Sequence, residues 1–424
     1  MLRRTRLLAA LGASALCLSA LAACSAEPGS APAADESTAA EPQVVGYSFP
    51  PGVVPGRTKD QPFYTRMDGV LVLPSTPGPH PVVMLVHGSY PHCIVAGKDV
   101  VITDAGNTVP WPEGCGKEKN VGENGLTEGP DYFRASASFG YLARELATRG
   151  FAVVVPDVNA KEEYWTGEPD ATLIQDGLVA AHLDLLKDLN AGHSHGLPWG
   201  DRAEGAFDLA DVSLVGHSSG GGYAQVAAHE GTVPGLSAVV ALQPAYQGVG
   251  TPTMKSPVPM LTVAGACDEQ VGPDEPVQDA KAFARANPKA PVLTAVMSHA
   301  THIATVAGGG SHEVGLVSPV EGKDCAADAL AAPEVVQGAT ALVVADFLEQ
   351  AHQGRTDFRL ASVEKTSLSV AALNEAGTVS THSVDDLPPA VSPDSITFDE
   401  STEALLPPLP EGMTIAVGKR GFDV

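Results

Sequence analysis

The chain has 424 residues, of which 44% are hydrophobic, so it is long enough to bury a large core in one big domain or in two. Its 25 basic and 50 acidic residues give a formal net charge of −25, which opposes binding to nucleic acid and to anionic lipid surfaces. Such a charge is typical of a soluble exported protein that self-repulsion keeps from aggregating, and it indicates little about a substrate.

The first residues are typical of a targeting segment. Arg3, Arg4 and Arg6 precede a long apolar run that closes on small residues before Cys24. This pattern resembles a bacterial lipoprotein signal. The resemblance implies that residues 1–23 are removed, that Cys24 is lipidated, and that the protein is exported to the outer face of the cell membrane or secreted. An ordinary secretory signal or an uncleaved anchor is the alternative.

Composition divides the remaining chain into three parts. Residues 24–45 contain few bulky apolar side chains, and we expect a disordered tether there. Residues 46–353 form the predicted folded domain, which includes a long loop at 89–129 that is rich in Gly, Pro and charge. Beyond it, residues 354–424 lose the regular pattern. This extension is expected either to add a small strand pair to the body or to be partly disordered.

Within the folded domain, predicted strands alternate with predicted helices. Strands are expected at 63–64, 69–73, 81–86, 151–155, 212–215, 236–242, 259–264 and 292–297, and helices at 132–148, 171–189, 277–286 and 333–350. The 81–86 run is continuously apolar, which indicates a strand buried on both faces. The leucines of 171–189 recur at helical spacing and indicate core packing. This order predicts an α/β fold with a mostly parallel central sheet and helices on both faces.

Four cysteines lie beyond the leader and Cys24. They allow three disulfide pairings, and proximity in sequence favours Cys93 with Cys115 and Cys267 with Cys325. The first pair would strap the 89–129 loop. No Cys-x-x-Cys or His-Cys cluster has zinc spacing, so disulfides are favoured over a metal site.

The most specific pattern is Gly216-His217-Ser218-Ser219-Gly220, between the predicted strand 212–215 and a helix of small residues. A serine on so sharp a turn has a strained backbone, and glycine two positions to either side lets the strand and helix approach each other. The Ser218 hydroxyl is then presented outward, and the helix N-terminus behind it favours developing negative charge. The pattern predicts a nucleophile, which needs a base to take its proton.

The turn at residues 216–220, called the elbow below, and the order of the predicted strands and helices resemble the α/β-hydrolase superfamily over roughly residues 60–352. The resemblance implies an acid after the next-but-one strand. Asp268, which follows strand 259–264, fits that place best, with Glu269 and Asp274 as fallbacks. The acid would hold the tautomer of a histidine and stabilise its imidazolium.

The same resemblance implies a histidine after the strand at 292–297. His302 ends Ala300-Thr301-His302, which aligns with the last three positions of the family's Gly-Ala-x-His. The sequence departs from that pattern at His299, which stands in place of the glycine and is the alternative base. It also implies two backbone N–H donors for an oxyanion. One is expected from Ser219, and the other from Ser89 or, slightly preferred, Tyr90, in the loop after the family-like His87-Gly88.

Other short motifs indicate a particular group within this superfamily. His87-Gly88 with Cys93, then Trp111-Pro112 with Cys115, resemble exported bacterial hydrolases that are distantly similar to dienelactone hydrolases, platelet-activating-factor acetylhydrolases and cutinases. Tyr164 and Trp165, in a loop, are candidates for lining the substrate pocket, although a loop aromatic pair is as often simple packing.

These observations predict a lipid-anchored serine carboxylesterase, with an acyl-enzyme on Ser218, His302 as base and Asp268 as orienting acid. We expect a monomer that acts on a small-molecule or lipid-like ester, contacts a membrane only through its N-terminal lipid, binds no nucleic acid and needs no cofactor or metal. A serine peptidase or amidase of the same fold is the first alternative. A non-catalytic anchored binding protein on a hydrolase scaffold is the second.

Overall fold

The computed structural model describes residues 41–54, 63–89, 99–103, 135–158, 168–245, 252–255, 257–308, 325–363, 366, 368–373, 377–382, 384–408, 411 and 414–418. They belong to the unit Ala40–Val424. Several predictions lie outside the described residues, namely those for the leader 1–23, most of the tether, Cys24, Tyr90, Cys93, Cys115, Tyr164 and Trp165.

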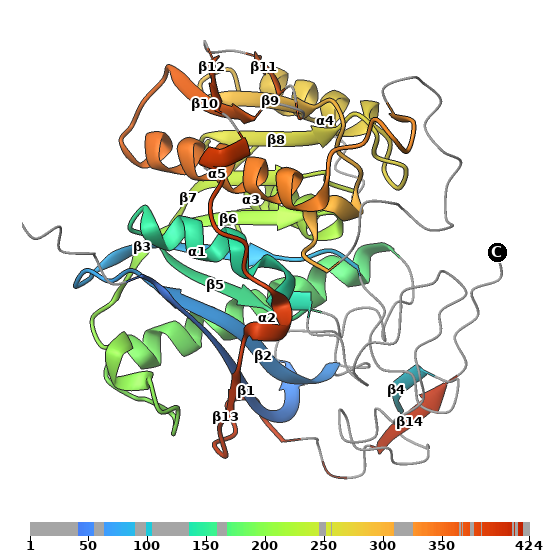
Figure 1. The fold of residues 1–424 in the computed structure, drawn as a ribbon. Helices are drawn as coiled ribbons and strands as arrows, with labels where there is room; N and C mark the ends of the chain where they lie inside the picture. Colours follow the sequence, from blue (N-terminus) through green and yellow to red (C-terminus); the bar gives the residue numbers. More distant parts are fainter. Residues whose placement is uncertain are drawn as a thin grey trace, which may run out of the picture. The chain divides into compact units, whose positions relative to one another are not determined.

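A ten-stranded sheet runs through this unit in the order β11-β9-β8-β7-β6-β3-β5-β2-β1-β13 (Figure 1). Its strands are β1 (Gln43–Val54), β2 (Phe63–Leu73), β3 (His80–Val86), β5 (Ala152–Pro156), β6 (Phe207–His217), β7 (Leu236–Leu242), β8 (Met260–Gly265), β9 (Val292–Met297), β11 (Ser369–Ala372) and β13 (Phe398–Glu400). Each neighbouring pair in the row β9, β8, β7, β6, β3 and β5 is parallel. The antiparallel pairs are β11 with β9, β2 with β5, and β1 with β2. The predicted α/β class with a mostly parallel sheet is confirmed.

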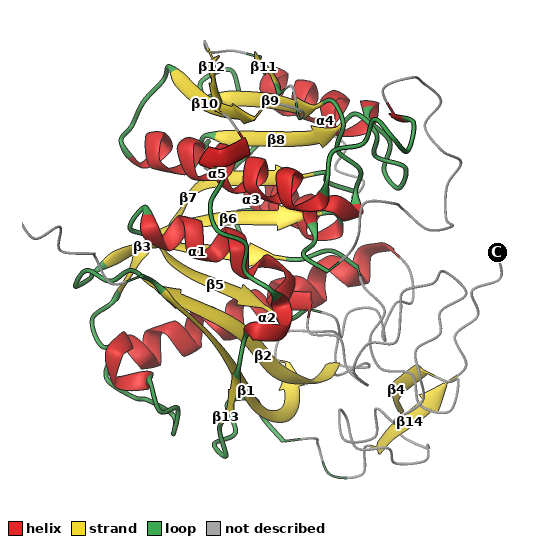
Figure 2. Ribbon diagram, viewed as in Figure 1, coloured by secondary structure: helices red, strands yellow, loops and turns green. Residues whose placement is uncertain are grey.

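Helices cover both faces of the sheet (Figure 2). One face carries α1 (Gly140–Thr148) and α5 (Pro333–His352), and the other carries α2 (Glu168–Asn190), α3 (Ser219–Glu230) and α4 (Asp274–Ala286). Strand β3 shows why the central strands are apolar throughout: Val83 and Leu85 pack on the α1 side, and Val82, Met84 and Val86 on the α2 side. Among the helices of the described part of the chain, none combines the length and apolarity needed to cross a membrane.

The long helix α2 buries the leucine stripe that the sequence predicts. Leu178, Leu185, Leu186 and Leu189 are each at most 3% exposed and belong to one core cluster. Among the described residues, short 3-10 helices span Ala135–Phe139, Gly200–Ala203, Ile303–Thr305, Val384–Asp386 and Pro393–Ser395.

Some boundaries differ from the predictions. Strand β1 begins at Gln43, because antiparallel pairing with β2 reaches Leu73, so the last residues of the predicted tether belong to the sheet. Strand β2 is continuous where two short strands are predicted. The predicted loop 89–129 contains a strand, β4 (Asp99–Thr103), which pairs antiparallel with β14 (Thr414–Gly418).

The C-terminal extension contributes to both edges of the main sheet. Strand β11 pairs with β9 at one edge, and β13 pairs with β1 at the other. Ile396 and Leu406 are 8% and 4% exposed and join the two core clusters, one on each face. A separate strand pair, β10 (Phe358–Val363) with β12 (Gly377–His382), follows α5. Strands β11 and β13 occupy edges of the main sheet where β9 and β1 would otherwise offer unpaired backbone groups.

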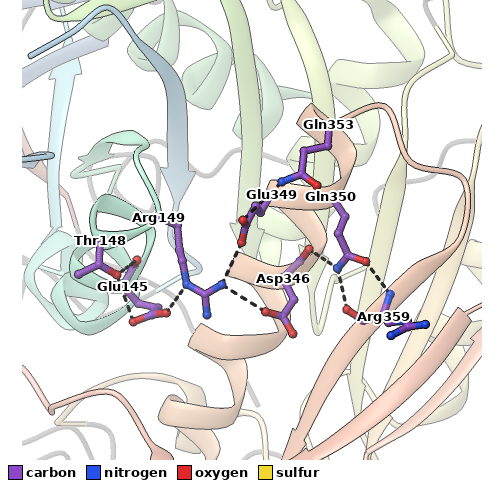
Figure 3. Close-up of polar contacts among 8 residues, drawn as sticks. All are labelled: Glu145, Thr148, Arg149, Asp346, Glu349, Gln350, Gln353 and Arg359. Atoms are coloured by element: carbon purple, nitrogen blue, oxygen red, sulfur yellow. Dashed lines mark hydrogen bonds and ion pairs between the residues drawn. The ribbon is translucent and has the colours of Figure 1, made fainter. Parts of the chain in front are cut away.

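At the surface, Arg149 links α1 to α5 (Figure 3). Its guanidinium lies 3.1 Å from Glu145 Oε1, 2.9 Å from Glu349 Oε2 and 3.5 Å from Asp346 Oδ1. Such largely exposed pairs contribute about 0–1 kcal/mol each, so they add little to stability. Nearby, the side-chain amide of Gln350 bonds both backbone groups of Arg359, at 2.6 and 2.7 Å.

Candidate active site

Ser218 lies on a sharp turn between β6 and α3. Its backbone has φ 55° and ψ −124°, a left-handed conformation that side-chain-bearing residues rarely adopt. From Val212 to Ala228 it is the one residue that is not buried. A strained serine that reaches the surface from an otherwise buried strand and helix matches the predicted elbow, and strain of this kind persists only where the surroundings impose it.

The two elbow glycines are required by close backbone approach. A Cβ on Gly216 would collide with the carbonyl oxygen of Gly220, and a Cβ on Gly220 would collide with that of Val86 in β3. Gly88, after β3, lies close to the serine itself, because a Cβ at position 88 would be 2.7 Å from the Cβ of Ser218. The loop after β3 therefore packs directly on the elbow.

Asp268 and His302 form a buried hydrogen-bonded pair. They follow β8 and β9, are 1% and 2% exposed, and Nδ1 of His302 lies 2.9 Å from Oδ2 of Asp268. The other carboxylate oxygen accepts the backbone N–H groups of Gln270 and Val271, at 3.0 and 2.9 Å. Because the ionised carboxylate only accepts, Nδ1 of His302 carries the proton and Nε2 is left as an acceptor.

The alternatives to this pair are placed differently. His299 lies half-buried in the turn after β9, where its carbonyl oxygen accepts the N–H of Ala331 at 3.0 Å. Glu269 is half-buried beside the pair, and Asp274 is exposed at the start of α4. The imidazole hydrogen-bonded to Asp268 is that of His302.

His217 connects the elbow to the histidine–acid pair. Its ring centroid is 4.7 Å from that of His302, with the ring planes tilted by 44°, and its Nε2–H donates to the carbonyl oxygen of His302 at 3.3 Å. Burial, followed by the nearby charge of His302, lowers the pKa of His217 well below its usual value. The residue next to Ser218 is therefore a neutral imidazole packed on His302.

Two of the residues predicted to donate backbone N–H groups to an oxyanion, Ser89 and Ser219, are described and have side chains in contact. The hydroxyls of Ser89 and Ser219 lie 3.1 Å apart, and Ser219 begins α3, where backbone N–H groups favour negative charge. Fully buried His87 supports this loop, since its Nε2 accepts the N–H of Val158 at 2.7 Å and its Nδ1–H therefore donates to the Gly88 carbonyl oxygen at 2.8 Å.

A disulfide joins Cys267 to Cys325. Cys267 directly precedes Asp268, and its N–H donates to the carbonyl oxygen of Ala300 at 3.1 Å. The bridge ties the acid-bearing loop to the segment that leads into α5. The second pairing predicted, Cys93 with Cys115, lies outside the described residues.

Sequence reasoning missed Gln243, which directly follows β7. It is 3% exposed, has φ 43°, and bonds to Thr301 and Thr305, on either side of His302. The only local signal is a polar residue at the end of an apolar strand, and many sheet residues share that pattern.

Within the described ranges, no group of three or more His, Cys, Asp or Glu side chains is arranged to hold a metal ion. In comparisons with known proteins, no protein-family model matches the chain and no curated protein is significantly similar to it. A functional assignment for this chain therefore depends on the geometry of the site.

Proposed function

We propose that this chain is a serine hydrolase of the α/β-hydrolase fold that cleaves carboxylic esters. Ser218, Asp268 and His302 follow β6, β8 and β9, whose parallel carboxyl ends share one edge of the sheet, where α/β proteins gather their chemistry. The observation that carries the proposal is the buried His302–Asp268 hydrogen bond beside the strained turn of Ser218.

In this mechanism, Ser218 Oγ attacks the ester carbonyl while Nε2 of His302 takes its proton. Asp268 keeps the proton of His302 on Nδ1 and stabilises the imidazolium as it forms. The backbone N–H groups of Ser219 and of Ser89 or Tyr90 stabilise the oxyanion. His302 then protonates the leaving alcohol, and water, deprotonated by the same imidazole, releases the acid from the acyl-enzyme.

The proposal includes the expected setting of the enzyme. We infer export, lipidation at Cys24 and action as a monomer on a small-molecule or lipid-like ester. The leader pattern of the sequence supports the first two inferences. Membrane contact would then occur only through the lipid.

A fluorophosphonate, which reacts covalently with activated serines, tests the proposal on protein that lacks the leader. We expect labelling at Ser218 and hydrolysis of a short-chain aryl ester. Ser218→Ala should abolish labelling and lower turnover by about 10⁴- to 10⁶-fold. Turnover that persists undiminished in this variant would overturn the proposal, and an aryl amide cleaved faster than the ester would indicate an amidase.

Ser213 offers a matched control for this variant. Its Oγ lies 3.0 Å from Nε2 of His352, whose Nδ1 lies 2.8 Å from Oδ2 of Asp211. The same three residue types therefore recur, with Asp211 and Ser213 on β6 and His352 at the end of α5. Ser213 is fully buried, and a substrate has no access to it. Ser213→Ala should therefore leave labelling and turnover unchanged.

A further inference from the structure

The segment that carries His302 is held by side chains rather than by a strand or a long helix. Four carbonyl oxygens within residues 301–305 accept hydrogen bonds from four separate elements: Thr301 from Gln243 (2.9 Å), His302 from His217 (3.3 Å), Ala304 from Gln337 (3.1 Å) and Thr305 from Tyr141 (2.8 Å). The placement of His302 therefore depends on residues distant from it in sequence.

Gln243 differs from the other donors because it bonds on both sides of His302. Its Nε2 donates to the Thr301 carbonyl oxygen, and its Oε1 accepts the Thr305 hydroxyl at 2.8 Å. A Cβ on Gly265, the last residue of β8, would lie 2.6 Å from this Nε2. Only a glycine at position 265 therefore leaves room for the Gln243 amide.

The backbone of Gln243 is also unusual. Its φ is 43°, and in the described part of the chain only His195 and Ser218 share a positive φ among residues other than glycine. Left-handed backbone costs about 1–2 kcal/mol for such a residue. Its N–H donates to the Val263 carbonyl oxygen at 2.6 Å, which anchors the turn to β8. This backbone conformation places the amide against the His302 segment, and the hydrogen bonds of the amide and of the Gln243 N–H offset its cost.

We propose that Gln243 is a positioning residue, whose amide clamps Thr301 and Thr305 and so holds the His302 imidazole on Asp268. This inference rests on the proposed function, in which His302 is the base. A displacement of about 1 Å from the productive geometry can cost about 10²-fold in rate. The clamp acts through His302, so its loss should lower kcat and leave KM nearly unchanged.

Gln243→Asn is the most direct variant. Asparagine tolerates positive φ better than most residues and keeps an amide, but it is one methylene shorter and cannot reach both threonines. Thr305→Val is the second variant, because it removes the hydroxyl from one side of the clamp with little change of shape. We expect a fall in kcat of roughly 10- to 100-fold for Gln243→Asn and a smaller fall for Thr305→Val, with KM within about threefold of wild type.

Gln350→Asn is the matched control. Gln350 also bridges two backbone groups, those of Arg359, at 2.6 and 2.7 Å (Figure 3). It lies 13 residues beyond Gln337 on α5, or about 20 Å along the helix, and is half-buried near the far end. The same shortening there should leave kcat, KM and labelling at wild-type values.

A second readout is independent of activity. The Nδ1 proton of His302, bonded to Asp268, should give a downfield proton resonance in the wild type, which broadens or exchanges faster in Gln243→Asn. An unchanged resonance in a folded variant would overturn the clamp, whatever the enzyme does. Absence of labelling in the wild type would instead overturn the proposed function, so the two failures are distinguishable.

Discussion

The strain at Ser218 leads to a prediction about stability that needs no substrate. Ser218→Gly and Ser218→Ala both remove the hydroxyl, and only glycine adopts φ 55° and ψ −124° without a steric penalty. We therefore expect Ser218→Gly to be the more stable of the two inactive variants.

The magnitude follows from two opposing terms. Releasing a residue from a sparsely populated backbone conformation recovers about 1–3 kcal/mol. Glycine loses more backbone entropy on folding than alanine, which costs about 0.5–1 kcal/mol. The net expectation is that the free energy of unfolding of Ser218→Gly exceeds that of Ser218→Ala by about 0–2.5 kcal/mol, with a midpoint of about 1 kcal/mol.

Ser213 provides the reference for this comparison. It is buried on the same strand, and its φ is not among the positive values in the described chain. Ser213→Gly should be less stable than Ser213→Ala by at least about 0.5–1 kcal/mol, since there glycine brings only its entropic cost. The sign of the Gly–Ala difference should therefore reverse between the two sites.

Guanidinium unfolding of the four variants, followed by circular dichroism, measures both differences on one scale. Subtracting the Ser213 pair from the Ser218 pair isolates the strain. If glycine is the less stable residue at both positions by equal amounts, the elbow stores no strain and the reasoning is refuted.

Two further predictions concern the surroundings of the site. Replacing Cys267 and Cys325 together by alanine should lower the free energy of unfolding by up to about 4 kcal/mol, since the bridge closes a loop with a sequence separation of 58, and guanidinium unfolding measures this. Burial keeps His217 neutral in the folded state, whereas the unfolded chain protonates it below about pH 6.5. Its stabilisation is thus complete above that pH and is lost as the pH falls, by up to about 1.4 kcal/mol per unit, and His217→Gln should flatten the stability–pH curve by that amount.

Each of these predictions has its own control. In the presence of a thiol, the wild type and the double cysteine variant should share one unfolding midpoint, and a variant as stable as the oxidised wild type in the absence of thiol would contradict the loop-closure argument. For the pH dependence, the curves of wild type and His217→Gln should run parallel above pH 7. Parallel curves down to pH 5 would show that His217 is protonated in the folded state too.

The C-terminal extension illustrates where sequence reasoning ended. Its short strands carry no strong pattern, and residues 354–424 are left open between a strand pair and disorder. Strands β11 and β13 form because β9 and β1 present unpaired edges, and those edges exist only once the sheet is assembled. Short strands are specified by their partners more than by their own residues.

The sequence alone determined the features that depend on near neighbours. The alternation of apolar strands with helices predicts the mostly parallel sheet, and five consecutive residues around Ser218 predict a sharp turn with its glycines. Both follow from periodicity and steric exclusion over a few residues. The tertiary structure alone decided what distant segments do together, because hydrogen bonds between side chains of different strand ends depend on the register of the folded sheet. That register brings His302 to Asp268, packs His217 on His302, and places Gln243 across Thr301 and Thr305.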